Sequence, residues 1–251
     1  MKAPVVVIGM GEIGAVFARG FLKTGHPVYP LRRDDSMSEL QASIEQPAAV
    51  IVAVGEADLQ PVLKQIPEQW LSVLVLLQNE LLPRDWSDLV IEPTVISIWF
   101  EKKKGQDSKV IIPSPAFGPL SQLLHDALAS VDIAVKVVAE QSSMLSELVV
   151  KNLYILTSNI AGLEVGGNVG QLWSDHRDVA EAVIDDILLI QEQLSGQALN
   201  KSELVDLMLV AFNGDPEHMC MGRSAAARLQ RALGQAEEFG IKLNKLPTIN
   251  S

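Results

Sequence analysis

A glycine-rich turn near the start of the chain limits the possible folds more than any other segment. It reads Gly9-Met10-Gly11-Glu12-Ile13-Gly14 and follows directly on the apolar run Val5-Val6-Val7-Ile8. Three glycines in this spacing, between a buried strand and a helix, are typical of a turn that binds a dinucleotide. The first allows a tight turn, the second lets backbone N–H groups approach a pyrophosphate, and the third lets the helix pack closely on the strand. A plain strand–helix turn is the alternative, but Gly25-His26-Pro27-Val28 completes a β–α–β unit and favours the dinucleotide site.

Apolar runs of strand length alternate with amphipathic segments through the first half of the chain. This alternation is typical of parallel strands joined by helices on both faces of a sheet. The predicted strands are residues 4–8, 27–31, 49–54, 73–77, 95–98, 110–112 and 133–138, and the predicted helices are 12–23, 38–45, 58–66 and 119–130. We therefore expect an α/β protein whose N-terminal part is a Rossmann domain with a doubly wound parallel sheet.

From about residue 140 the apolar residues take helical spacing. Segments 142–161, 177–194, 201–209 and 223–239 all show it, with hardly any β-branched run of strand length. Polar residues able to cap a helix follow the last predicted strand at 139–142. The expected organisation is a dinucleotide-binding domain over residues 1–141 and an all-α substrate and catalytic domain over residues 142–251.

The charge and the apolar segments limit the partners of the chain. A net charge of −11 argues against a nucleic-acid surface, which needs clustered Lys and Arg. The apolar stretch 3–10 is too short to span a membrane, and Glu12 follows where a signal peptide would still be apolar. The single cysteine, Cys220, excludes an intramolecular disulfide, and no Cys/His cluster has the spacing of zinc ligands. We expect a cytoplasmic protein without a metal; a homodimer is compatible with the sequence, which leaves the oligomeric state open.

Two arginines follow the second predicted strand. An acid at this point binds the ribose 2′-hydroxyl of NAD, whereas a cation suits the additional phosphate of NADP. The chain has Arg32 and Arg33 here, and arginine grips a phosphate through a planar fork of donors. The alternative is that both simply pair with Asp34 and Asp35 on the surface. We predict NADP, bound along residues 9–14 and by the two arginines.

Further segments add to the glycine turn. Leu76-Leu77-Gln78-Asn79 ends the fourth predicted strand, and Glu147-Leu148-Val149-Val150-Lys151 continues to Ser158-Asn159 in the first helix of the second half. Asn168-Val169-Gly170-Gln171-Leu172 then precedes a further helix. Together these segments resemble the ketopantoate reductase (2-dehydropantoate 2-reductase) family over most of the chain. The chain is similar to a divergent and shortened member, since its helical part is only about a hundred residues and is expected to lack part of the usual bundle.

The resemblance implies an NADPH-dependent reductase of a small carbonyl substrate. It implies that Lys151 is catalytic, that Asn79 lies near both the nicotinamide and the substrate, and that Asn159 binds the substrate. Val54 and Gly55, after the third predicted strand, are expected beside the cofactor.

Three positions depart from the family. Glu80 stands where glycine is usual after Asn79, and Gly55 stands where the family has a lysine near the cofactor. Ser224 takes the place of a glutamate that binds the substrate hydroxyl, and neither Arg223 nor the alanines 225–227 can act as that carboxylate. These departures put ketopantoate itself in question more than the fold or the cofactor.

Lys151 also stands out from the residues alone. Its segment is apolar nearly all round, so a lysine there needs a partner or a function. Either it pairs with Glu147 one turn earlier, or it faces the cleft between the domains and polarises a substrate carbonyl. The polar strip that includes Ser158 and Asn159 favours the cleft.

A catalytically inactive NADP-binding protein that senses redox state or regulates a partner is the alternative function.

Overall fold

The computed structural model describes residues 2–90 and 92–250. The chain divides into two compact units, Met1–Glu147 and Leu148–Ser251. The division falls inside helix α5 (Gln141–Val165), whereas the sequence placed the domain boundary at the first residues of that helix. No described helix combines the length and the apolarity needed to cross a bilayer.

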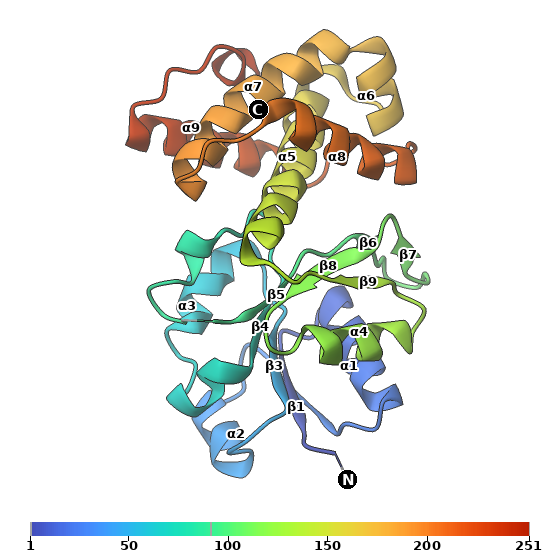
Figure 1. The fold of residues 1–251 in the computed structure, drawn as a ribbon, viewed down its shortest axis with the longest axis vertical. Coiled ribbons are helices and arrows are strands. Elements are labelled where there is room, and N and C mark those ends of the chain that lie inside the picture. The colour runs from blue at the N-terminus through green and yellow to red at the C-terminus, as the bar shows by residue number, and fades with distance from the viewer. Residues whose placement is uncertain (1, 91, 251) are drawn as a thin grey trace. The chain divides into compact units, whose positions relative to one another are not determined.

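The first unit is built on one large, mostly parallel sheet. Its strands lie in the order β2-β1-β3-β4-β5-β8-β9, and within this sheet, as far as it is described, only the β5–β8 pair is antiparallel (Figure 1). The strands are β1 (Val5–Ile8), β2 (Val28–Leu31), β3 (Ala49–Val52), β4 (Leu74–Leu76), β5 (Thr94–Ile96), β8 (Ser114–Phe117) and β9 (Val135–Val137). The predicted α/β class and the doubly wound Rossmann sheet are confirmed.

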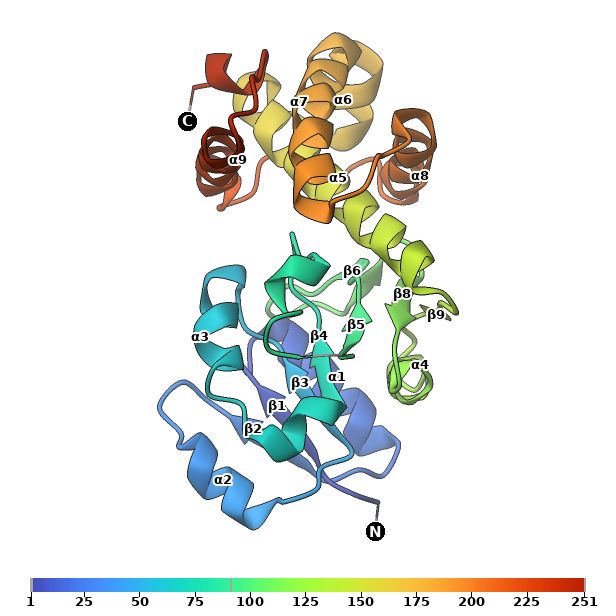
Figure 2. The same ribbon diagram turned by 60° about the vertical axis from the view of Figure 1, so that its left-hand side comes forward.

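Helices cover both faces of this sheet. The helices are α1 (Glu12–Lys23), α2 (Met37–Ser43), α3 (Leu59–Leu63) and α4 (Ser121–Ala129), and short 3₁₀ helices occupy Glu56–Asp58, Glu68–Val73 and Pro83–Asp85. Figure 2 shows α2 and α3 on one side of the sheet and α1 and α4 on the other. The last two pack so closely that a Cβ on Gly20 would lie 2.5 Å from the carbonyl oxygen of Ala127.

The core of the first unit explains the continuous apolar strands. Both faces of β1 and β3 are covered, and all four residues of each strand are buried. Phe17 and Phe21 of α1 and Leu124 and Leu128 of α4 fill the space against one face. Three of the four tryptophans of the chain lie in this unit; Trp70 and Trp99 are fully buried and Trp86 nearly so.

Two features between β5 and β8 were not predicted. Strand β8 has the sequence Ser-Pro-Ala-Phe and pairs antiparallel to β5. The sequence pattern did not indicate this strand, because proline is rare inside strands. The chain between them forms a separate hairpin of β6 (Phe100–Glu101) and β7 (Lys109–Val110), called the β6–β7 hairpin below. The sheet is therefore not wholly parallel, because this hairpin reverses the chain direction before β8.

The second unit is helical, as predicted. It contains most of α5, with α6 (Val169–Asp175), α7 (Arg177–Ser195), α8 (Lys201–Gly214), α9 (Ala225–Phe239) and a 3₁₀ turn at Leu246–Thr248. Figure 1 shows α6, α7, α8 and α9 grouped round the later part of α5. From Leu148 to Gly162, a stretch described throughout, every residue of α5 is buried except Lys151. The fourth tryptophan, Trp173, lies half-buried on α6 under the guanidinium of Arg177.

The side chain of Asp186 on α7 binds the segment that follows α9. Its carboxylate is buried and accepts hydrogen bonds from the backbone N–H groups of Asn244, Lys245 and Leu246, at 2.7–3.1 Å. Lys245 adds an ion pair to Glu164 of α5 at 2.7 Å. The segment after α9 is therefore an anchored part of the bundle.

Candidate functional site

The glycine turn has the geometry that a dinucleotide-binding turn requires. Gly9 has a φ of +92°, and a Cβ there would lie 2.6 Å from the carbonyl oxygen of Ala53. A Cβ on Gly14 would overlap the carbonyl oxygen of Gly9, so only glycine lets α1 start this close to β1. At Gly11, in contrast, a Cβ would meet nothing within 4 Å. The turn is thus tight on the protein side and open on the side where a ligand would approach.

Helix α1 begins directly at this open side. Gly11 is its N-cap and no side chain caps the helix, because glycine has none to offer. The first N–H groups of a helix have no partner inside the helix and carry a partial positive charge. The start of α1 can therefore receive an anion such as a phosphate.

A cavity of about 550 Å³ opens beside the turn, within the first unit. Strand β1 lies between β2 and β3, and in sheets of this kind ligands bind at the carboxyl ends of such strands. The cavity lies at these ends, and α3 contributes a further wall. It is lined by Ile8, Gly9, Met10, Leu31, Arg32, Arg33, Asp35, Met37, Val54, Gly55, Asp58, Pro61, Val62 and Gln65.

Six of the predicted cofactor residues therefore lie round one cavity. They are Gly9, Met10, Arg32, Arg33, Val54 and Gly55. Among the described residues, the other five predicted positions do not line it: Gly11, Glu12, Ile13 and Gly14 belong to the turn and the start of α1, and Asn79 follows β4.

The two arginines at this cavity are not equivalent. Arg33 pairs with Asp58 at 3.2 Å, and its side chain is 85% exposed. Arg32 makes no side-chain ion pair with a described residue; its backbone N–H donates to the carboxylate of Asp35 at 2.7 Å. Neither guanidinium is paired with Asp34 or Asp35, the alternative that the sequence left open. Arg32 is therefore the cation that can take up a phosphate without first breaking an ion pair.

The end of β4 is held by Gln78, a residue that the sequence had not singled out for a role. Its side-chain N–H groups donate to the carbonyl oxygens of Val52 at 2.6 Å and Val54 at 3.3 Å, and its side-chain oxygen accepts from the N–H of Leu77. The next residue, Asn79, is half-buried in a turn. Glu80 follows with a φ of +60°, the left-handed conformation that favours glycine. The backbone shape of an Asn-Gly turn is thus present although the glycine is not.

Lys151 is the one residue between Leu148 and Gly162 of α5 that is not buried. Its ammonium lies 5.5 Å from the centroid of the Tyr154 ring, within range of a cation–π interaction. The carboxylate of Glu147 pairs with Lys136 of β9 at 3.1 Å. Glu147, the partner that one of the two readings of the sequence gave to Lys151, therefore already has a cationic partner on β9.

Asn159 is buried two turns further along α5. Its side-chain oxygen accepts a hydrogen bond of 2.9 Å from Arg228 of α9, and its amide contacts the hydroxyl of Ser158 at 3.4 Å. Ser158 donates to the carbonyl oxygen of Tyr154 at 2.7 Å. Arg228, whose position the sequence had not marked, is thus the residue of α9 that meets Asn159.

Ser224 is the residue that precedes α9. It is exposed, and its side chain does not cap the helix. Its carbonyl oxygen accepts from the backbone N–H of Arg228, so the two residues lie one turn apart. The acids of α9 are Glu237 and Glu238 in its last turn, so the described first turn of this helix carries no carboxylate.

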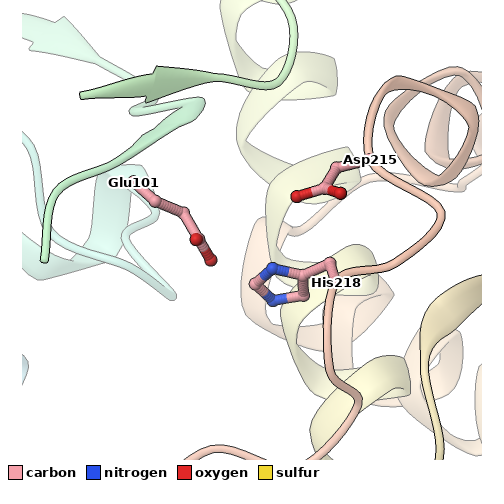
Figure 3. A group of neighbouring side chains, drawn as sticks. All are labelled: Glu101, Asp215 and His218. Carbon is pink, nitrogen blue, oxygen red and sulfur yellow. The ribbon is translucent and has the colours of Figure 1, made fainter. Parts of the chain in front are cut away.

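The loop between α8 and α9 contributes Asp215 and His218. A carboxylate oxygen of Asp215 and a ring nitrogen of His218 lie within 4.8 Å of each other, and Figure 3 shows both side chains on this loop; Glu101, also labelled there, belongs to the other unit. The ring of His218 lies 5.8 Å from that of Tyr154. The loop is therefore packed against the part of α5 that carries Lys151.

The two methionines of this loop lie on the surface. Met219 and Met221 are 63% and 58% exposed. Cys220 between them is buried, and burial raises the pKa of its thiol to about 11. Its backbone N–H donates to Gly167, which ties the loop to the start of α6.

The chain thus has a glycine-turn Rossmann unit followed by a helical unit with a buried central helix. It matches no protein-family model and no curated protein sequence. Solved structures share its fold along nearly the whole length. The ketopantoate reductase of Staphylococcus aureus, described as dimeric, superposes with a TM-score of 0.65 at 16% identity, over 98% of this chain and 96% of that one.

Two further structures have the same fold. The 2-dehydropantoate 2-reductase of Methylococcus capsulatus gives a TM-score of 0.69 at 13% identity, over 98% of this chain and 94% of that one. A D-mandelate dehydrogenase in complex with NADH gives 0.68 at 11% identity, over 98% and 96%. The fold is therefore that of the ketopantoate reductases, as the resemblance implied.

Proposed function

We propose that this chain is an NADPH-dependent reductase of a small carbonyl substrate. The observation that carries the proposal is the cavity at the glycine turn, where the open start of α1 and the guanidinium of Arg32 lie at the carboxyl ends of neighbouring strands. The residues fit the cofactor: Gly11 leaves room for a pyrophosphate, apolar side chains such as Leu31 and Val62 can flank a base, and Arg32 can bind a 2′-phosphate.

The known fold adds support for an oxidoreductase. The structural neighbours are named as reductases or dehydrogenases, and one was solved with both NADH and anilino(oxo)acetate. The compounds in these names, ketopantoate and anilino(oxo)acetate, point to 2-oxo acids as the class of carbonyl compound to test first. Because that neighbour holds NADH, the fold alone does not decide between NADH and NADPH. The residues of this chain decide it, and Arg32 favours NADPH.

We assign the catalytic role to Lys151. A bound nicotinamide would supply the hydride. The ammonium of Lys151 would donate a proton to the carbonyl oxygen or stabilise the negative charge that develops on it. The partial burial of Lys151 on an otherwise buried helix strengthens such an interaction, because little water competes with it. Asn79, Asn159 and Ser224 are the candidates for further substrate contacts.

Titration of the purified protein with NADPH and NADH tests the cofactor, and turnover of ketopantoate and other 2-oxo acids tests the reaction. We expect NADPH to bind more tightly than NADH. Lys151→Met should lower kcat roughly a hundredfold to ten-thousandfold and leave NADPH affinity unchanged. Lys201→Met, on the exposed start of α8, is the matched control and should keep full activity. Binding of neither cofactor would refute the proposal.

The second candidate is an NADP-binding protein without catalysis that senses redox state or regulates a partner. The lack of a carboxylate in the first turn of α9, with Ser224 exposed before it, favours this alternative. Two results together would support it over the reductase. The protein would bind NADPH tightly, with the same affinity in Lys151→Met, and it would turn over no 2-oxo acid.

A further inference from the structure

We propose that Lys102 of the β6–β7 hairpin is a positioning residue of the dinucleotide site: it neutralises Glu12 and so keeps the start of α1 favourable for a pyrophosphate. This inference rests on the proposed function, because it concerns the same cofactor site. It assigns a role to a run of charged residues, 101–104, between two strands.

Glu12 poses an electrostatic problem at this site. It is the first residue of α1 and directly follows Gly11, where the open side of the turn would receive the pyrophosphate. A carboxylate at a helix start stabilises the helix through its dipole. The same carboxylate repels an incoming anion and competes with it for the positive helix end. A cation beside Glu12 removes this conflict.

Lys102 is placed to act as that cation. Its ammonium lies 3.5 Å from a carboxylate oxygen of Glu12. The same ammonium donates to the carbonyl oxygen of Lys103 at 2.9 Å and to that of Gln106, both in its own hairpin. These two carbonyl oxygens hold the ammonium in its own hairpin, and the ion pair with Glu12 is added to them. Its side chain is only 21% exposed, compared with 68% for its neighbour Lys103.

The topology explains why this hairpin reaches the glycine turn. Strands β1, β3, β4 and β5 are parallel, so their carboxyl ends lie at one edge of the sheet. The glycine turn leaves β1 at this edge, and the β6–β7 hairpin leaves β5 there. The N–H of Ile111 donates to the carbonyl oxygen of Trp99, and the N–H of Trp99 donates to the hydroxyl of Ser114, which closes the base of the hairpin.

Lys102 also provides a positive charge that the residues after β3 and β4 lack. Gly55 and Asn79, which follow β3 and β4, carry no positive charge. Arg32 and Arg33 follow β2 and line the cavity beside the turn, which Lys102 does not line. Lys102 is the lysine for which the structure records an ion pair with the turn itself, within the described residues.

A double-mutant cycle measured by NADPH binding tests the inference. We expect Lys102→Met to weaken NADPH binding roughly fivefold at low salt, and less at high salt. Lys104→Met, an exposed lysine of the same hairpin, is the matched control and should change the affinity less than about twofold. In a Glu12→Gln background, Lys102→Met should have almost no effect, because no charge remains to be neutralised. Unchanged melting temperatures would verify that the variants are folded.

The probe 2′-AMP separates the two ends of the site. It lacks the pyrophosphate, so its affinity should be the same in the wild-type protein and in Lys102→Met. Equal losses with Lys102→Met and Lys104→Met, or a loss for Lys102→Met that persists in full with Glu12→Gln, would overturn the neutralising role. If the wild-type protein binds no dinucleotide, the proposed function fails as well; if it binds NADPH and Lys102→Met is silent, only this inference fails.

Discussion

The side-chain amide of Gln78 donates a hydrogen bond of 2.6 Å to the carbonyl oxygen of Val52, and so joins the end of β4 to the end of β3. The same amide also donates to the carbonyl oxygen of Val54 and accepts from the backbone N–H of Leu77. The side chain of Gln78 is itself buried. Strand hydrogen bonds stop at this point, so without Gln78 several buried backbone groups would have no partner. Asn79, a predicted substrate and cofactor residue, takes its position from this connection.

Replacing Gln78 by leucine should therefore destabilise the protein by about 2 kcal/mol, since it leaves buried backbone groups unsatisfied. Urea denaturation of the two proteins measures the difference. Gln230→Leu, on the exposed face of α9, is the control and should change the free energy of unfolding by less than about 0.5 kcal/mol. Equal stability of Gln78→Leu and wild type would contradict the role given to this amide.

The glycines of the turn should separate stability from binding. Gly14→Ala places a methyl group against the carbonyl oxygen of Gly9 and should cost about 3 kcal/mol or more. Gly11→Ala meets no protein atom, so the fold should keep its melting temperature. We expect it to weaken NADPH binding by at least roughly tenfold, because the methyl group enters the space for the pyrophosphate. A Gly11→Ala protein with full NADPH affinity would argue against a pyrophosphate at this turn.

Arg32 should determine the preference for NADPH. Arg32→Gln removes charge-assisted hydrogen bonds to a 2′-phosphate and should weaken NADPH binding roughly tenfold or more, while NADH binding stays within about twofold. Isothermal titration calorimetry with both cofactors measures the two effects. Equal losses for NADPH and NADH would mean that Arg32 does not contact the 2′-phosphate.

Asp58 should compete with the cofactor for Arg33. Their ion pair is largely exposed, so it is weak and a phosphate can displace it. Asp58→Asn releases the guanidinium and removes a negative charge from the cavity wall, which should strengthen NADPH binding roughly threefold. If Arg33→Gln abolishes that gain, the effect passes through Arg33; a gain that survives Arg33→Gln would assign it to the lost charge alone.

Asp186 should be important for the stability of the second unit. Asp186→Ala removes the acceptor of three backbone N–H groups in a buried place and should cost about 3 kcal/mol. For a chain of this length that corresponds to a fall in melting temperature of roughly 6–12 °C. Asp185→Ala, its exposed neighbour on α7, should lower the melting temperature by less than about 2 °C.

Cys220 should be unreactive in the folded protein. Its pKa is raised to about 11 by burial, and only the thiolate reacts with alkylating reagents. At pH 8 we expect labelling by iodoacetamide to be at least about a hundredfold slower in the native protein than in urea. The folded state holds the proton more tightly than the unfolded state, so this thiol favours folding below the unfolded pKa. That contribution is lost as the pH rises toward 11.

The architecture was largely readable from the sequence because burial on both faces leaves continuous apolar strands. Helix α1 was predicted at its observed bounds, since the glycines at its start and the polar residues at its end mark both termini. Strand β8 was missed because Pro115 at its centre is rare in strands. The length of α8 was underestimated, since the apolar spacing weakens after Leu209 although the helix continues to Gly214.

The candidate site was only partly readable. The residues of the cofactor cavity follow strand ends, and strand ends are predictable from the pattern. The contacts of Lys102 with Glu12 and of Arg228 with Asn159 join positions far apart in the sequence, and nothing in the local pattern pairs them. A run of charges such as residues 101–104 normally indicates a solvated surface. Only the structure shows that Lys102, the second residue of the run, is largely buried beside Glu12.

The distribution of the tryptophans makes the two units optically distinguishable. Three indole rings report on the first unit, and Trp173 alone reports on the second. In a Trp173→Phe variant, all tryptophan emission would come from the nucleotide-binding unit, and in a variant that keeps only Trp173 it would come from the helical bundle. Comparison of their denaturation curves would reveal whether the two units melt together or in sequence.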